Sequence, residues 1–154
     1  MYIDDRERPA PGASVTAAGV DHVRLWYHYL DIGDLDAYGS LLDEHAQVSR
    51  PDAPPGHGRA EVLERQAALS RATAEHHIYK IIAADDAVAV MGRYLSPSRA
   101  APERDGGGKD EGKDDGDGDH VEFADFFTLT DKGLLLSCRR YYFVAPEQQD
   151  GRAA

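Results

Sequence analysis

The hydrophobic pattern of the chain changes its period once, near residue 76, and this change limits the fold more than any other feature. Before it, apolar residues such as Val20, Val23 and Tyr27 recur every three or four positions, which is the spacing of one helix face. After it, apolar and polar residues alternate, as they do on a half-buried strand. A run of helices followed by a run of strands predicts an α+β fold, with the helices packed against one side of an antiparallel sheet.

Three helices are expected in the first half of the chain. The first begins at Val15 and ends before Gly33, because glycine suits the position just past a helix end. Asp34 suits the N-cap of a second helix, which forms a hairpin with the first. Residues 48–58 are expected to form a short strand and a turn-rich loop, and residues 59–70 form a third, shorter helix.

Four long strands follow, in two hairpins. The first hairpin joins residues 76–84 to residues 87–95 across a two-residue turn. The second joins residues 121–130 to residues 134–144 across a three-residue turn, in which Gly133 can adopt a positive φ.

Length and composition indicate a single domain. A chain of 154 residues can bury one core, and residues 15–145 are expected to form it. Residues 1–14 and 146–154 are expected to be a disordered arm and tail. Residues 97–119 are an acidic, glycine-rich insert, which is expected to be a solvated loop.

Several classes of partner and cofactor are disfavoured. The formal net charge of −11 argues against a nucleic-acid partner. The chain has no apolar stretch of membrane-spanning length and no signal peptide at its N-terminus, so a cytoplasmic protein without a membrane partner is expected. The acidic insert does not have the EF-hand spacing, so no metal site is predicted. The single cysteine, Cys138, rules out an internal disulfide and is expected to be a small buried apolar residue.

Asp125 interrupts the apolar face of the third long strand. Alternation places it between Phe123 and Phe127 on that face, where an ionised carboxylate needs a partner or a raised pKa. The three-residue turn places it opposite Arg139, and a shift of one residue would place it opposite Arg140. A pocket acid and a structural ion pair both fit this pattern.

Two adjacent histidines open the first long strand. His77 shares its face with Tyr79 and Ile81, whereas His76 shares the other face with Lys80, so polarity predicts that His77 points inward. A single histidine on an apolar face is more often a core residue than a catalyst.

Asp31 lies at the end of the first predicted helix. The last turn of a helix carries partial negative charge, so a carboxylate there is locally unfavourable. It therefore needs a compensating partner or a function.

Four segments taken together resemble one family. They are "YLDIGDLDAYGSLLDEHAQV", "GRAEVLE", "HHIYKII" and "GLLLSCRRYYF", and in this order they are similar to the SnoaL-like branch of the nuclear-transport-factor-2-like superfamily. The resemblance covers residues 18–144. It implies a cone-shaped α+β barrel, in which a strongly curved antiparallel sheet wraps around three helices and encloses an apolar pocket.

The resemblance also implies an activity. Members are dehydratases, cyclases and isomerases that use general acids and bases without a cofactor, on small, apolar, oxygenated substrates such as polyketides and other intermediates of secondary metabolism. In the dehydratases an aspartate at the end of the first helix pairs with a histidine that opens the first long strand; here these are Asp31 and His76. The alternation of polar and apolar residues favours His77, so both histidines stay candidates.

The strand carboxylate of related enzymes corresponds to Asp125. In ketosteroid isomerase the general base aligns with Arg50, which argues against a mechanism with that base.

Further residues are predicted to contact the substrate. The first helix carries Trp26 where bile-acid dehydratases have a tyrosine, and Tyr27 is adjacent. Asp125, Arg139 or Tyr141 is expected to stabilise a developing oxyanion.

An alternative is a non-catalytic small-molecule-binding module or a dimeric interaction module of the same fold. Homodimerisation is expected in either case. The outer face of the sheet would carry an apolar patch too large for a monomer to expose, made of Ile78, Ile82, Ala89 and Met91.

Overall fold

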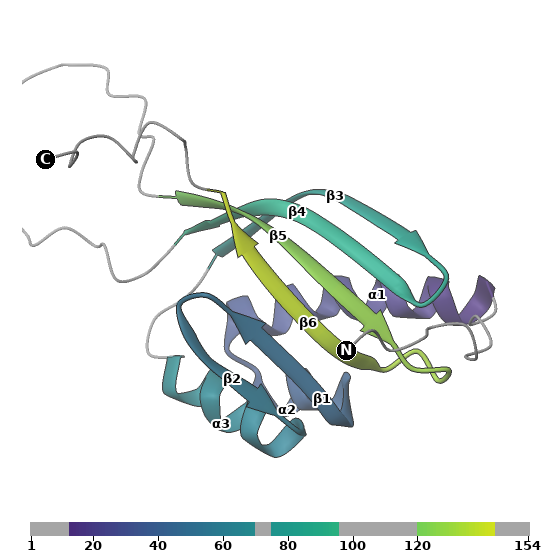
Figure 1. The fold of residues 1–154 in the computed structure, drawn as a ribbon, viewed down its shortest axis with the longest axis horizontal. Coiled ribbons are helices and arrows are strands. Elements are labelled where there is room, and N and C mark those ends of the chain that lie inside the picture. The colour runs from purple at the N-terminus through teal and green to yellow at the C-terminus, as the bar shows by residue number, and fades with distance from the viewer. Residues whose placement is uncertain (1–12, 70–74, 96–119, 144–154) are drawn as a thin grey trace, which may run out of the picture.

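The computed structural model describes residues 13–69, 75–95 and 120–143 (Figure 1). The predicted acidic insert and C-terminal tail lie outside the described residues, as does the predicted N-terminal arm except for its last two positions. The described elements are, in chain order, α1 (Ala13–Ile32), α2 (Leu35–Ser40), β1 (Leu42–Arg50), β2 (Ala53–His57), α3 (Arg59–Leu69), β3 (Glu75–Ala84), β4 (Ala87–Leu95), β5 (His120–Leu129) and β6 (Leu135–Tyr142). The predicted order of helices and long strands is confirmed.

The chain forms an α+β fold around one curved, unclosed sheet. The strand order is β2-β1-β6-β5-β4-β3, and every neighbouring pair is antiparallel except β1 and β6, which run parallel. The sheet is therefore mixed and not wholly antiparallel. α1 contacts β3 to β6 and runs along one face of the sheet, while α3 packs on β1 and β2 (Figure 1). None of the helices in this described part has the length and apolarity that crossing a bilayer requires.

A hairpin of β1 and β2 replaces the predicted short strand and loop. β2 contains Pro54 and Pro55, a residue type that is typical of loops and turns. Proline cannot donate a hydrogen bond to a neighbouring strand, but an edge strand has a free side, and β2 is an edge of the sheet. The sheet thus gains a strand that composition alone argued against.

The helices meet the sheet through an aromatic core. Trp26 is buried, with ring centroids 4.7 Å from Tyr38 and 5.3 Å from Phe127. Gly33 ends α1 with a φ of 73°, and the Asp34 carboxylate accepts a hydrogen bond from the backbone N–H of Ala37 at 3.0 Å to cap α2. These caps set the turn between α1 and α2 and so the position of the α1 C-terminus beside the sheet.

A bulge in β3 reverses the faces of the two histidines. Ile78 pairs with Gly92 but Lys80 pairs with Met91, so Tyr79 is an extra residue in the ladder. His76 and Ile78 therefore face the helices together with Ile81. The prediction that His77 points inward is wrong, because it assumed unbroken alternation back from Ile81.

A second bulge, in β6, changes the partner of Asp125. Thr128 pairs with Ser137 but Leu129 pairs with Leu135, which leaves one extra residue between them. The shift places Asp125 opposite Arg140. Of the two partners that the sequence allowed, the structure selects the one that requires a shift of one residue.

The outer face of β3 to β6 carries large, half-exposed apolar side chains. The register aligns Ile82 with Ala89 and Phe126 in one row, and Met91 with Tyr141 in the next. Ile78 is not part of this face, because the bulge turns it toward the core. The predicted apolar patch is therefore present without that residue, and Phe126 and Tyr141 extend it.

Candidate active site

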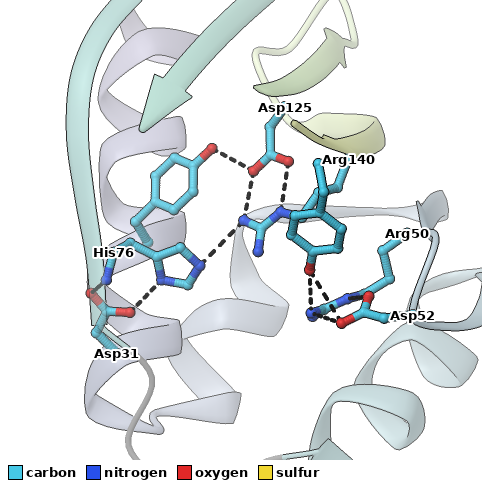
Figure 2. Close-up of polar contacts among 8 residues, drawn as sticks. Asp31, Arg50, Asp52, His76, Asp125 and Arg140 are labelled. Carbon is cyan, nitrogen blue, oxygen red and sulfur yellow. Dashed lines mark hydrogen bonds and ion pairs between the residues drawn. The ribbon is translucent and has the colours of Figure 1, made fainter. Parts of the chain in front are cut away.

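The inner face of the sheet holds a buried ion pair between β5 and β6. The Asp125 side chain is 0% exposed and accepts hydrogen bonds from Nε and Nη2 of Arg140, each at 2.8 Å (Figure 2). The Tyr27 hydroxyl donates a third at 2.7 Å. This bidentate geometry is the strong form of an arginine–carboxylate pair. Asp125 therefore positions Arg140 and Tyr27, and it does so with both of its oxygens.

Asp31 and His76 form a second pair, which answers the question of why a carboxylate ends α1. Asp31 accepts a hydrogen bond from the backbone N–H of His76 at 3.0 Å, and its other oxygen lies 2.5 Å from Nδ1 of the imidazole (Figure 2). The His76 side chain is 3% exposed and that of Asp31 is 25% exposed. The unfavourable position at the helix end is thus offset by two contacts to one partner.

Arg140 connects the two pairs and determines the tautomer of His76. Its Nη2 lies 3.2 Å from Nε2 of the imidazole. A guanidinium only donates hydrogen bonds, so Nε2 must accept and the ring proton sits on Nδ1, facing Asp31. Burial lowers the pKa of His76; Arg140 lowers it further, and Asp31 only partly opposes this. His76 is therefore neutral at pH 7, with its lone pair directed at a cation.

A second arginine cluster lies at the C-terminal ends of β1 and β6. Arg50 donates to Asp52 through Nε at 2.5 Å and Nη2 at 2.8 Å, and to the Tyr142 hydroxyl at 2.9 Å. The Tyr142 hydroxyl in turn donates to Asp52 at 3.2 Å. Burial opposes the charge of Arg50, but its hydrogen bond to Asp52 and the charges of Tyr142 and Asp52 together outweigh burial and raise the pKa of Arg50. Burial raises the pKa of Tyr142.

Aromatic rings join the two clusters. The Tyr94 ring centroid lies 5.5 Å from Cζ of Arg140 and 6.0 Å from Cζ of Arg50, and 4.9 Å from the centroid of His76. The Phe123 ring centroid lies 4.2 Å from Cζ of Arg140. Such contacts shield guanidinium groups from water without using their donors.

The joined clusters carry a net negative charge. Two guanidiniums face three carboxylates, and because His76 is neutral the formal sum is 2 − 3 = −1. A small cavity between α3 and the β1–β2 hairpin reaches these groups at Arg50, and its other walls include Tyr38, Val48 and Val62.

The structure brings together four of the residues that the sequence pointed to: Asp31, His76, Asp125 and Tyr27. The other four lie elsewhere. His77 is exposed and contacts Glu75 at 2.8 Å; the remaining three are Trp26 in the core and Arg139 and Tyr141 on the outer face.

Sequence reasoning missed most of the second cluster. Arg140 was one of two possible partners of Asp125. Arg50 was considered only because it occupies the position of the general base of ketosteroid isomerase. Tyr142 shares its face with Arg140, so the same one-residue shift would have found it. Asp52 fell in a predicted loop, and Tyr94 carried no polar signal of its own.

Comparison with known proteins agrees with this arrangement of elements. The family model of the SnoaL-like domain matches residues 23–137. The chain belongs to the SnoaL-like domain family. No curated protein matches this SnoaL-like chain.

Solved structures of the same fold are numerous and distant in sequence. A protein with a cystatin-like fold from Methylobium petroleophilum PM1 is 12% identical, with a TM-score of 0.67 over 94% of this chain and 86% of that one. A protein with a ketosteroid isomerase-like fold from Catenulispora acidiphila is 16% identical, with a TM-score of 0.62 over 80% and 86%. The epoxide hydrolase/cyclase-like enzyme SalBIII, of pyran ring formation in salinomycin, is 21% identical, with a TM-score of 0.60 over 83% and 92%. At these identities the likeness concerns the fold.

Proposed function

We propose that this SnoaL-like protein is a general acid/base enzyme that removes a proton from the carbon next to a carbonyl group. Its substrate is a small, apolar, oxygenated compound such as a polyketide or another intermediate of secondary metabolism. His76 is the base, Asp31 orients it, and Arg140 stabilises the oxyanion. The observation that carries this proposal is the 3.2 Å contact between the lone pair of His76 and the guanidinium of Arg140.

A base beside a cation is what enolisation needs. The carbonyl oxygen and the acidic C–H of a ketone lie on adjacent atoms, so the donor for one and the acceptor for the other must also be neighbours. The contact to His76 is the longest of the three that Arg140 makes within this network. A carbonyl oxygen that accepts this N–H from Nη2 would free Nε2, while the two bonds to Asp125 keep Arg140 in place.

The charges stay balanced during the proposed step. When Nε2 takes the proton, the imidazolium is stabilised by Asp31, which already accepts the Nδ1 proton. The enolate oxygen faces Arg140. The site begins and ends with the same total charge, so this step needs no further ion or cofactor.

Exchange of ketone protons for deuterium tests the proposal without knowledge of the natural substrate. The protein is incubated with 1-indanone in D₂O, and loss of the protons next to the carbonyl is followed by NMR. His76→Gln should slow the protein-dependent exchange by at least about 100-fold, the usual contribution of a general base. His77→Gln is the matched control, since the adjacent imidazole is on the exposed face. Equal exchange by both variants would contradict the proposal.

A non-catalytic binding module is the second candidate, and one observation favours it. Among the described residues, every buried side-chain nitrogen or oxygen has a hydrogen-bond partner inside the protein. A network of this kind can serve to hold a fold together. Saturable binding of 1-indanone without any exchange above buffer would support this function and reject the enzyme.

A further inference from the structure

We infer that Tyr142 is the acid partner of His76, so that the reaction is the elimination of water from a β-hydroxy carbonyl compound. This inference rests on the proposed function, because it needs His76 as the base and Arg140 as the carbonyl site. It adds a catalytic residue and selects a lyase from the dehydratases, cyclases and isomerases that the family suggests.

His76 and Tyr142 lie next to the same cation. Nε2 of His76 is 3.2 Å from Arg140, and the Tyr142 ring centroid is 6.0 Å from Cζ of that guanidinium. Both side chains face the inner side of the sheet, one from β3 and one from β6. A carbonyl group on Arg140 would therefore have the base near its α-carbon and the Tyr142 hydroxyl near a substituent one carbon further on.

Tyr142 has the protonation state of an acid. Burial raises its pKa, so it holds its proton at pH 7, whereas Arg50 and Arg140 both act to stabilise a phenolate. Its oxygen already accepts a hydrogen bond from Arg50 at 2.9 Å, which leaves its own proton to be donated. That proton now goes to Asp52 over 3.2 Å, a long bond that a leaving hydroxyl group can replace.

Each of the two groups has its own contact with solvent. His76 is bonded to Asp31, whose side chain is 25% exposed, and Tyr142 is bonded to Asp52, whose side chain is 49% exposed. An isomerase needs one residue that returns the proton it took. Elimination instead requires one group that loses a proton and another that gains one between turnovers, and separate solvent contacts suit that requirement.

The step balances without an oxidant or reductant. His76 takes the α-proton, and the electrons of that C–H bond form the carbon–carbon double bond as the C–O bond at the β-carbon breaks. The departing oxygen takes the proton of Tyr142 and leaves as water. Transfer of one proton from His76 to Tyr142 through solvent then restores the enzyme.

Tyr27 is the other tyrosine of the site, and its contacts argue against the same role. Its hydroxyl donates to the fully buried Asp125 at 2.7 Å. Burial, with Asp125 adding to it, raises the pKa of Tyr27 far above its ordinary value. A phenolate there would have neither a solvent contact nor a cation of its own.

Two related probes separate the acid from the base. 1-Indanone reports proton removal by deuterium exchange, and 3-hydroxy-1-indanone reports elimination by the absorbance of the conjugated product. Tyr142→Phe should slow elimination by at least about 100-fold and slow exchange by no more than about fivefold, because only elimination needs a general acid. Tyr141→Phe is the matched control on the outer face and should leave both rates unchanged.

The outcomes distinguish this inference from the function on which it rests. Elimination at the wild-type rate by Tyr142→Phe would overturn the role of Tyr142, and so would an equal loss of elimination and exchange in that variant. In either case the proposed function still stands if the wild-type protein shows exchange that depends on His76. Absence of both reactions in the wild-type protein would reject the proposed function itself. If Tyr142→Phe does not fold, Asp52→Asn replaces it. That variant removes the exposed carboxylate that can pass a proton between solvent and Tyr142, so it should slow elimination more than exchange.

Discussion

The two arginine–aspartate pairs have the same chemistry and different burial, and this contrast predicts very different costs of breaking them. Asp125 is 0% exposed and Arg140 is 7% exposed, whereas Asp52 is 49% exposed. Asp125→Asn removes the charge that compensates Arg140 and turns an N–H₂ group toward its donors. Loss of one partner of a buried pair costs about 3–5 kcal/mol, because the other charge stays buried without compensation.

Asp52→Asn is the matched control. Its pair with Arg50 has similar hydrogen-bond distances, but water screens it, so the expected cost is less than about 1 kcal/mol. For a domain with a stability of about 5–15 kcal/mol, the buried substitution would remove a large share and the exposed one very little.

Urea unfolding at pH 7 measures the difference. The midpoint of Asp125→Asn should fall strongly with an unchanged m-value, since a change in m would mean that the unfolded or folded state had changed in compactness. Similar losses for both variants, or a loss below about 1 kcal/mol for Asp125→Asn, would refute the reasoning that burial makes this pair costly to break.

Three further predictions concern the Asp31–His76 pair and the outer face. Asp31→Asn should slow deuterium exchange by about 10-fold or more and cost no more than about 1 kcal/mol in urea unfolding, because its side chain is partly exposed. The pKa of His76 is lower in the folded protein than in the unfolded chain, so below about pH 6.5 the unfolded chain binds a proton that the folded protein does not. The free energy of unfolding should therefore fall as the pH falls below about 6.5. The urea midpoint of His76→Gln should lack this dependence on pH. We propose that two copies pair through the outer face, so sedimentation at micromolar concentration should find a dimer that Phe126→Arg dissociates, and a wild-type monomer would reject this packing.

Periodicity predicted the elements better than it predicted their faces. The helical period and the later alternation located α1, α3 and four long strands, since both patterns extend over many residues. β2 was missed because Pro54 and Pro55 usually mark a loop, and only the position of β2 at the sheet edge makes them acceptable.

The site depended on contacts between distant parts of the chain. Asp31 and His76 are 45 positions apart, and Arg50 and Tyr142 are 92 apart. A local pattern can mark a carboxylate as out of place, as it did for Asp31 and Asp125. It does not identify which distant group compensates it, because that depends on strand order and register.

The two bulges account for the remaining difference between the predicted and the observed site residues. A sheet with unbroken alternation would turn His77 inward and place Arg139 opposite Asp125, so the sequence-based choices were consistent with each other and described a bulge-free sheet. Gly92 is a sequence signal for the first bulge. A Cβ at that position would lie 2.3 Å from the carbonyl oxygen of His77, so no other residue fits while β3 keeps its path. The glycine lets β3 approach β4 closely where the extra residue is inserted, and the insertion turns His76 toward Arg140. Conversely, an isolated glycine in a predicted strand indicates that the neighbouring strand can contain a bulge. Residues on both faces of that neighbouring strand should then be considered as catalytic candidates.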